Sequence, residues 1–218
     1  MKKTGFTLAE VLVTIGIIGV VSAMVIPTFT AQTQAAKIGP SLGKAVAEFE
    51  QATKAMLDDA QVDAISRASV PAVGLCGENT VLTAPLCFAE YLSHHMKGTV
   101  VETIPEFIAS NGVIYKFIGM DSGTRPSSPT LAHMRTIGRA FNSLVVDING
   151  DSGPNRDSKD LFYFDVMDDG SLRPWGFSGE TNQDDRWTAA CQRNQKPIHA
   201  TRCAGHIMEN GLKAEYKL

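Results

Sequence analysis

Several motifs that mark common enzymes and nucleic-acid-binding proteins are missing from this sequence. Its 218 residues contain no H-E-x-x-H helix and no phosphate-cradling glycine loop, which removes the usual signals of zinc peptidases and nucleotide-binding enzymes. No run of basic residues occurs downstream of the N-terminus, and the net charge is -3 at pH 7. Internal repeats and low-complexity tracts are also absent. We therefore expect a protein without enzymatic activity and without a nucleic-acid partner.

Cysteine pairs of the C-x-x-C type are absent as well, and the four cysteines form two local pairs instead. The pairs are Cys76 with Cys87 and Cys191 with Cys203. Four cysteines allow three pairings; closeness in the sequence favours these two, and each disulfide would stabilise the fold by about 3 kcal/mol. An even number of cysteines behind a membrane-targeting segment favours disulfides in an oxidising compartment. A metal site that adds His199 and His206 to the second pair is less favoured, because its spacing matches no common zinc pattern.

Charged residues are absent from positions 11–36. The first part of this stretch, VLVTIGIIGVVSAMVIP, can cross a bilayer once residues on either side are added, since about 20 apolar residues suffice. Lys2 and Lys3 precede the stretch, and the positive-inside tendency then places the N-terminus in the cytoplasm. The remainder of the chain would lie on the other side, which agrees with the expected disulfides.

Glu10 stands at the beginning of the apolar stretch and separates two interpretations. An ordinary secretory signal has an apolar core of about 7–15 residues followed by a small-residue cleavage site. Residues 11–21 and the Val21-Ser22-Ala23 segment would supply both. Such a signal has no use for a carboxylate, which costs about 3 kcal/mol inside a bilayer unless it is paired. The carboxylate therefore indicates a function within the membrane segment.

The residues around Glu10, KTGFTLAE from Lys3, resemble the prepilin signature of type IV pilins and type II secretion pseudopilins. The resemblance implies that a prepilin peptidase cuts after Gly5 and that the new N-terminal Phe6 is methylated. It also implies that Glu10 pairs with the N-terminal amine of a neighbouring subunit during assembly, which offsets the cost of a carboxylate in lipid. Pro27 stands where this family tends to carry a proline in the same helix.

The same resemblance implies the architecture and the partners of the chain. We expect an α+β fold shaped like a ladle, with a long N-terminal α-helix, transmembrane in its first half, packed on a small antiparallel β-sheet head. The expected segments are a leader peptide at 1–5, a membrane-spanning helix at 6–29, an amphipathic helix at 30–60 and the head at 61–218. Expected partners are homologous pilin or pseudopilin subunits, prepilin peptidase and the inner-membrane assembly machinery. The protein would cross the bacterial inner membrane once, with a periplasmic or extracellular head, before incorporation into a pilus or pseudopilus.

An apolar stripe continues the helix beyond the membrane. Apolar residues recur at steps of three, four or seven positions and predict a helix that runs to about Asp59. They are Ile38, Leu42, Val46, Phe49, Met56 and Ala60. Gly39-Pro40 interrupts the pattern, so we expect a kink or a brief break there, and Pro27 should also bend the helix.

The head is predicted from shorter patterns. Residues 87–96 have helical character, residues 112–119 and 143–148 alternate as strands, and residues 161–166 and 171–175 form a hairpin around a D-D-G turn. Residues 204–209 are expected to form a helical turn and residues 212–216 a final edge strand. Successive strands joined by turns and packed on one long helix predict an antiparallel sheet.

A polar segment between two predicted strands suits a calcium ion. The candidate ligands are Asp147, Asn149, Asp151, Asn155 and Asp157. Carboxylate and amide oxygens, with glycines that let backbone carbonyls turn inward, are the ligands that calcium prefers. The opening D-x-N-x-D resembles an EF-hand loop, but glycine is misplaced and Ser158 stands where a bidentate Glu belongs. The alternative is a surface connection whose Asp, Asn and Gly residues form turns, and both interpretations stay open. No other cofactor is expected.

The remaining candidates are weaker. His94 and His95 end a helical stretch, where capping or solvent exposure is favoured over metal binding. Trp175, with Phe177 and Trp187, fits the role of pinning an irregular loop to the sheet better than that of a binding patch. Two other classes of function are kept as alternatives to a fibre subunit. They are an exported calcium-dependent binding module and an exported enzyme without a recognisable motif.

Overall fold

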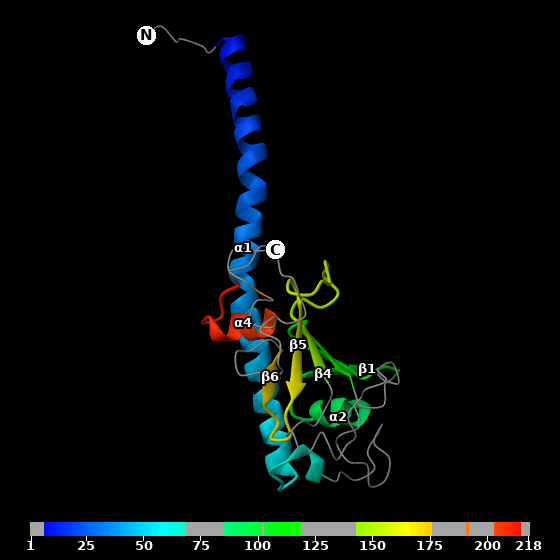
Figure 1. Ribbon diagram of the computed structural model, residues 1–218. Coiled ribbons are helices and arrows are strands. Elements are labelled where there is room, and N and C mark those ends of the chain that lie inside the picture. The colour runs from blue at the N-terminus through cyan, green and yellow to red at the C-terminus, as the bar shows by residue number, and fades with distance from the viewer. Residues whose placement is uncertain are drawn as a thin grey trace, which may run out of the picture.

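A long helix and a six-stranded sheet are the largest elements of the described part of the molecule. The computed structural model describes residues 7–68, 85–101, 103–118, 143–175, 191 and 203–214, without the side chains of 27–32, 34 and 35. Its longest element is α1, Leu8–Asp59, a single helix of 52 residues. At about 1.5 Å per residue α1 is about 78 Å long, and its first half projects from the rest of the molecule (Figure 1). The expected fold class, a long N-terminal helix on an antiparallel sheet, is confirmed.

The second half of α1 is amphipathic, as the apolar stripe predicts. The buried members of the stripe are Ile38, Leu42, Val46, Phe49 and Met56. The opposite side of the helix, which includes Lys44 and Lys54, is exposed. The expected boundary near residue 30 between membrane and amphipathic segments falls where the side chains are not described, so it stays a prediction.

α1 runs without interruption through Gly39 and Pro40, so the brief break expected there is wrong. Pro40 lacks the amide hydrogen that would bond the carbonyl of Ala36, and only proline is a poorer helix former than glycine. The neighbouring Ile38 and Leu42 are buried in the head, and this burial offsets the poor local preference. Tertiary packing decides the conformation at this point.

Six antiparallel strands form the sheet of the head, in the order β1-β2-β3-β4-β5-β6. They are β1 Gly98–Val101, β2 Glu106–Ala109, β3 Ile114–Ile118, β4 Ser143–Asp147, β5 Leu161–Val166 and β6 Leu172–Pro174. The last two form the predicted hairpin, in which Val166 pairs with Leu172. Gly170 in its turn has a φ of 83°, a conformation that glycine adopts without strain. Every residue of β4 is buried, which makes it the central strand of the core.

Two strands and one terminal segment differ from the sequence prediction. The sequence pattern did not indicate β1 and β2, because each has four residues and too few side chains alternate to reveal a period of two. The edge strand expected at 212–216 is wrong for residues 212–214, which belong to no strand, and residues 215 and 216 lie outside the described part. Leu212 has a φ of 62°, which is incompatible with an extended strand.

Aromatic side chains between α1, α2 and the sheet fill the core. α2, Pro85–Leu92, is shorter than the helix expected at 87–96 and is followed by turns. The ring of Phe49 on α1 lies 6.1 Å from that of Phe88 on α2 and 5.5 Å from that of Tyr115 on β3. The Tyr115 hydroxyl donates a hydrogen bond of 2.9 Å to the carbonyl of Ala45. α1 is therefore tied to the sheet by packing and by a buried polar contact. The short 3-10 helix η1, Ile65–Arg67, follows α1.

α4, Cys203–Glu209, contacts β5, β6 and α1. Gly211 and Leu212, both with a positive φ, turn the chain after α4 onto α1. There Leu212 meets α1 at Gly39 and Gly43. Figure 1 shows α4 beside α1 where the projecting half of the helix meets the head.

Candidate assembly site and polar loop

A capping box holds the N-terminal end of α1. The N-cap is Thr7, whose hydroxyl accepts a hydrogen bond of 3.3 Å from the amide of Glu10. The carboxylate of Glu10 accepts two hydrogen bonds of 2.8 Å, from the amide and the hydroxyl of Thr7. A Thr-x-x-Glu sequence before an apolar run forms this arrangement because the first amides of a helix otherwise lack partners.

Thr7 is the residue of this site that sequence reasoning missed. The T-x-x-E spacing was a visible signal, since it is a known mark of a helix start. The capping box directs the Glu10 carboxylate toward the start of the helix, where the helix dipole favours negative charge. Gly5 and Phe6 lie outside the described residues, and Pro27 lies within α1 without a described side chain. The roles of these three residues stay predictions.

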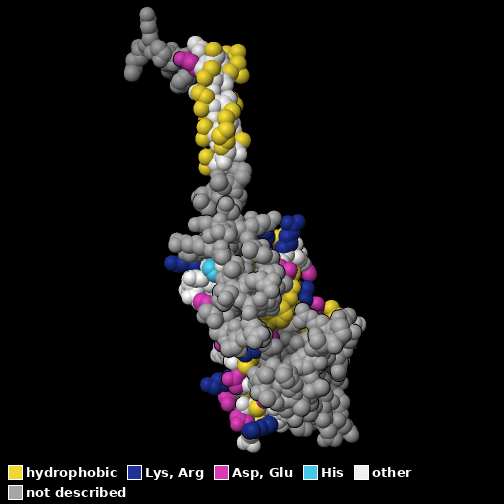
Figure 2. Space-filling model, in the orientation of Figure 1, with side chains coloured by type: hydrophobic (Ala, Val, Ile, Leu, Met, Phe, Trp, Pro, Cys, Tyr) yellow, Lys and Arg dark blue, Asp and Glu magenta, His cyan; other side chains and the backbone are white. Residues whose placement is uncertain are grey.

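The part of α1 that follows the capping box is exposed on all sides. The segment Leu8–Ile26 is long and apolar enough to cross a membrane, and it is not buried inside the head. Its large apolar side chains are between 44% and 80% exposed. Figure 2 shows them along the projecting part of the helix. Its 19 residues extend about 28 Å, close to the about 30 Å of a hydrocarbon core. A helix that is apolar all round requires lipid or other helices around it.

Asp147, the first of the predicted calcium ligands, ends β4 and is fully buried. Its Oδ1 accepts a hydrogen bond of 3.4 Å from the amide of Asn149, whereas its Oδ2 has no hydrogen-bond partner among the described residues. Burial raises the pKa of Asp147, and the charge of Asp160 adds to this increase. The amides of Asn149 and Gly150 and the charge of Lys116 act in the opposite direction without cancelling it. The buried carboxylate thus lacks a full set of partners.

The other predicted ligands point to different groups. Asn149 donates through its side-chain nitrogen to the carbonyl oxygens of Ser152 and Gly153. Asp157 accepts a hydrogen bond of 3.0 Å from the hydroxyl of Tyr163. Such hydrogen bonds are typical of Asp and Asn residues that stabilise the conformation of a surface loop. The remaining two candidates, Asp151 and Asn155, are exposed.

Asp160 is a buried carboxylate of the same loop and is not among the predicted ligands. It accepts hydrogen bonds from the amides of Asn155 at 2.8 Å and Arg156 at 2.5 Å. Within the described ranges, no three His, Cys, Asp or Glu side chains gather so that they could hold a metal ion. The hydrogen bonds of Asn149 and Asp157 are directed to different groups, and calcium binding at the five predicted ligands stays a prediction. The unpartnered Oδ2 of Asp147 is the feature that fits a cation best.

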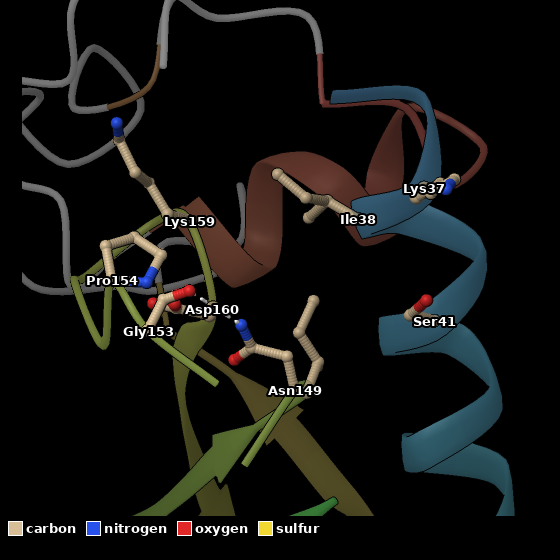
Figure 3. Close-up of a pocket in the computed structure, with 9 residues that line it drawn as sticks. Lys37, Ile38, Ser41, Asn149, Gly153, Pro154, Lys159 and Asp160 are labelled. Atoms are coloured by element: carbon tan, nitrogen blue, oxygen red, sulfur yellow. Dashed lines mark hydrogen bonds between the residues drawn. The ribbon is translucent and has the colours of Figure 1, made fainter. Parts of the chain in front are cut away.

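A cavity of about 290 Å³ separates the loop from α1. Figure 3 shows Lys37 and Ser41 on the α1 side, and Lys159 and Asp160 on the loop side. Ser41 is the centre of the sequence GPSLG, which matches the G-x-S-x-G pattern of a hydrolase nucleophile elbow. Such an elbow is a sharp turn between a strand and a helix, whereas Ser41 lies inside an uninterrupted helix. The pattern therefore does not create a nucleophile here.

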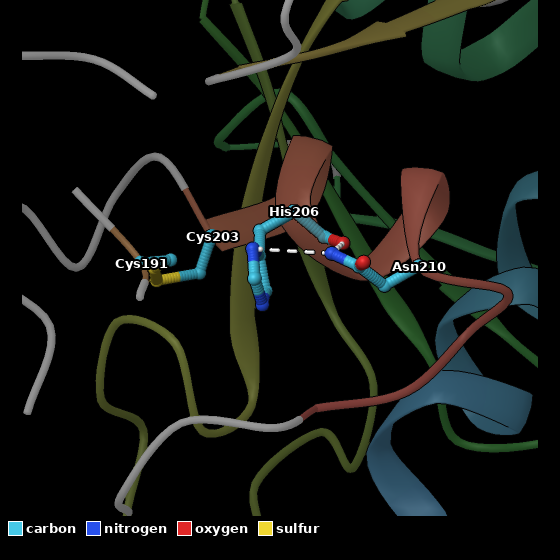
Figure 4. Close-up of a disulfide and its surroundings, with 4 residues drawn as sticks. All are labelled: Cys191, Cys203, His206 and Asn210. Atoms are coloured by element: carbon cyan, nitrogen blue, oxygen red, sulfur yellow. Dashed lines mark hydrogen bonds between the residues drawn. A yellow bond between two sulfur atoms is a disulfide. The ribbon is translucent and has the colours of Figure 1, made fainter. Parts of the chain in front are cut away.

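A disulfide joins Cys191 to Cys203 at the start of α4, with the two Cα atoms 5.4 Å apart. Both cysteines are buried. His206 follows one turn later, and its Nδ1 lies 3.2 Å from the side-chain nitrogen of Asn210 (Figure 4). The disulfide takes the sulfur atoms that the alternative metal site required. His199 lies outside the described residues.

The other predicted disulfide involves one described cysteine. Cys87 is buried on α2 and is disulfide-bonded. Cys76, its expected partner, lies outside the described residues. The pairing of these two cysteines stays a prediction.

The weaker candidates have structural contacts. His94 is exposed, and His95 lies with its Nδ1 3.7 Å from a carboxylate oxygen of Asp59. The ring of Trp175 lies 5.4 Å from that of Tyr163, and its Nε1 donates a hydrogen bond of 3.1 Å to Asp165. Trp175 therefore packs on the sheet, as expected of an aromatic residue that pins a loop. Phe177 and Trp187 lie outside the described residues.

Comparison with known proteins supports the identity of the N-terminal site. Residues 1–26 match the family described as the prokaryotic N-terminal methylation motif. This motif is the signature of type IV pilins and pseudopilins, so the N-terminal segment is prepilin-like. It implies assembly with other pilin subunits and recognition by prepilin peptidase in general, and it agrees with a membrane-anchoring helix. No curated protein and no solved structure matches the chain.

Proposed function

We propose that the protein is a structural subunit of a type IV pilus or of a type II secretion pseudopilus. The observation that carries this proposal is the methylation motif at residues 1–26, which includes the apolar helical span Leu8–Ile26 that is exposed on all sides. An isolated subunit needs lipid around that helix, whereas a fibre surrounds it with the same helix of other subunits. The proposal assigns no catalysis to the chain.

Processing and assembly follow in two steps. Prepilin peptidase cuts after Gly5, and α1 stays in the inner membrane as the anchor of a single-pass protein with its N-terminus on the cytoplasmic side. Lys2 and Lys3 before the apolar helix, and the Cys191–Cys203 disulfide after it, support this orientation. The anchored subunit then leaves the lipid and enters a bundle of α1 helices.

Glu10 gives the assembly step its specificity. In the single chain its Oε2 accepts both hydrogen bonds from Thr7, which lowers but does not remove the cost of a carboxylate at the membrane. In the bundle the amine of a neighbouring Phe6 adds an opposite charge. Breaking such a buried pair costs more than forming it gains, so the pair disfavours subunits in the wrong register.

The mature N-terminus tests the proposal. Mass spectrometry of the protein purified from its membrane should find a chain that begins with methylated Phe6. A chain that begins at Met24, after the Ser22-Ala23 site, would show an ordinary secretory signal and favour an exported binding module or enzyme.

Two variants of Glu10 test the charge pairing separately from the processing. Glu10→Gln keeps a side chain that completes a capping box, because Glu and Gln both serve at this position. Glu10→Ala removes both the charge and the box. Both variants should be cleaved after Gly5 and remain in the membrane, yet be missing from fibres sheared from cells. Wild-type incorporation of Glu10→Gln would refute the charge pairing while leaving the proposed class intact.

A further inference from the structure

The segment after α4 packs so closely on α1 that two positions of the helix have no room for a side chain. A Cβ atom added to Gly39 would lie 1.6 Å from the carbonyl oxygen of Leu212, and one added to Gly43 would lie 2.6 Å from Leu212 Cδ1. Both distances are shorter than any real contact of a Cβ atom. The two glycines, one helical turn apart, therefore form a seat for Leu212.

The chain that reaches this seat is held in an unusual conformation. Leu212 has a φ of 62°, which is unfavourable for a residue with a Cβ atom and persists only where the surroundings fix it. Its amide donates a hydrogen bond of 2.9 Å to the carbonyl of Ile207 on α4. α4 is fixed in turn by the disulfide from Cys203 to Cys191 and by a hydrogen bond of 2.9 Å from the amide of Gly205 to the carbonyl of Trp175.

The seat lies where α1 is weakest as a helix. Gly39 and Pro40 are the two poorest helix formers in succession, and Pro40 removes one backbone hydrogen bond. The helix nevertheless continues through both residues. On one side Ile38 and Leu42 are buried in the head, and on the glycine side Leu212 covers the backbone.

We propose that residues 203–214 form a clamp that keeps α1 helical across Gly39-Pro40. The clamp acts where the exposed part of α1 enters the head, so it determines whether the head is held rigidly on its anchor. The Cys191–Cys203 disulfide attaches the base of the clamp, which makes the helicity of α1 at Gly39-Pro40 depend on a covalent bond elsewhere in the head. This inference concerns the folded chain itself and holds whether or not the chain builds a fibre.

Hydrogen exchange of the full chain in detergent micelles, read by mass spectrometry, tests the clamp. A chain that ends at Asn210 keeps α4 and the disulfide but loses Leu212. Amides of residues 36–43 should exchange about tenfold faster in this variant, because local opening becomes easier. A chain that ends at Ala214 is the matched control and should exchange like the wild type. Wild-type exchange at residues 36–43 in the chain ending at Asn210, with β4 still protected, would overturn the proposal.

Substitutions at the two glycines give a second test that deletes nothing. Gly43→Ala collides with the flexible Leu212 side chain, so it should speed exchange in residues 207–214, and adding Leu212→Ala should restore slow exchange. Gly39→Ala collides with the Leu212 backbone, so the same second substitution should not rescue it. Gly153→Ala, which meets no atom within 4 Å, is the control. Slow exchange in residues 207–214 of Gly39→Ala would overturn the proposal, even if the shortened chain fails to fold.

A third experiment removes the disulfide with the double substitution Cys191→Ser and Cys203→Ser. Exchange should accelerate both in residues 207–214 and in residues 36–43, because the base of the clamp is released. Acceleration confined to residues 207–214 would show that α1 does not depend on the clamp, and it would overturn the coupling.

Discussion

Replacing Asp147 by Asn should make the protein more stable at neutral pH. The Asp147 side chain is fully buried, and its Oδ2 has no hydrogen-bond partner among the described residues. Leaving a buried polar atom unpaired costs about 1–3 kcal/mol. Asn keeps the shape and the oxygen that accepts from Asn149, and it removes both the buried charge and its repulsion with the charge of Asp160. We expect a gain of about 1 kcal/mol, because a buried neutral amide costs less than a buried charge but still lacks a full set of partners.

The sign of the pH dependence follows from the raised pKa of Asp147. A group whose pKa is raised by folding contributes its stability below the pKa of the unfolded chain, near 3.8, and loses it as the pH rises through the folded-state pKa. The advantage of Asp147→Asn should therefore be present at pH 7 and vanish below about pH 4. Thermal unfolding followed by circular dichroism in detergent should show a rise of about 2–4 °C at pH 7. A variant that melts at or below the wild-type temperature at pH 7 would refute the argument from the unpaired oxygen.

The same variant tests calcium at the loop. If calcium binds there, millimolar calcium should raise the melting temperature of the wild type, and Asp147→Asn should lose much of this rise because a neutral oxygen replaces a carboxylate. Asp169→Asn is the control, since this carboxylate lies in the β5–β6 turn and accepts hydrogen bonds from Ser171. Those bonds lower the pKa of Asp169, so removing this carboxylate should destabilise the fold. It should not change any rise in melting temperature that calcium causes. An unchanged melting temperature of the wild type at millimolar calcium would show that this loop does not bind calcium.

Three further predictions concern the core and its polar contacts. Phe49→Ala should lower the free energy of unfolding by about 3–5 kcal/mol in denaturant titrations, since it empties the centre of the aromatic core. Tyr115→Phe should cost about 1 kcal/mol in the same assay, because it removes only the hydrogen bond to Ala45. Burial, and then the hydrogen bond to Asp157, raise the pKa of Tyr163 to about 12. The protonated phenol contributes its full stabilisation of the folded state below about pH 10. This contribution decreases as the pH rises from about 10 to about 12. Tyr163→Phe should flatten this alkaline decrease, and an unchanged pH profile would refute the assignment.

Long periodic patterns in the sequence predicted the fold, whereas short ones did not. The stripe from Ile38 to Met56 identified both the helix and its buried side, and the D-D-G turn identified the β5–β6 hairpin. β1 and β2 were missed because four residues are too few to show alternation. A kink or a brief break was expected at Gly39-Pro40 because local preference is visible in the sequence, and the break is absent because Leu42 is buried and Leu212 packs on the two glycines, which the sequence does not reveal.

The candidate site divides in the same way. The prepilin signature around Glu10 could be read directly, because its residues are adjacent in the sequence. The T-x-x-E spacing of the capping box was equally visible, although the sequence prediction did not include Thr7. The calcium loop could not be read directly, because binding requires convergence in space. Asp157 pairs with Tyr163 and Asn149 with backbone carbonyls of its own turn, which composition alone does not reveal. The unpartnered oxygen of Asp147 emerged only with the burial of β4.

The physical chemistry of α1 explains why, in the proposed fibre, one carboxylate would govern assembly. The apolar side chains of Leu8–Ile26 find hydrocarbon on all sides both in lipid and in a bundle of helices, so their burial hardly distinguishes the two states. What differs between the states is the environment of Glu10, whose carboxylate accepts from Thr7 in the part of the single chain that the structure describes and can meet a cationic amine in the proposed bundle. A small change in the partners of one group therefore shifts an equilibrium that many apolar contacts leave nearly balanced. On this reasoning, removing the charge with Glu10→Gln should change incorporation far more than trimming an apolar side chain, such as Ile18→Val, in the same span. Equal effects of the two substitutions would mean that apolar packing selects the fibre.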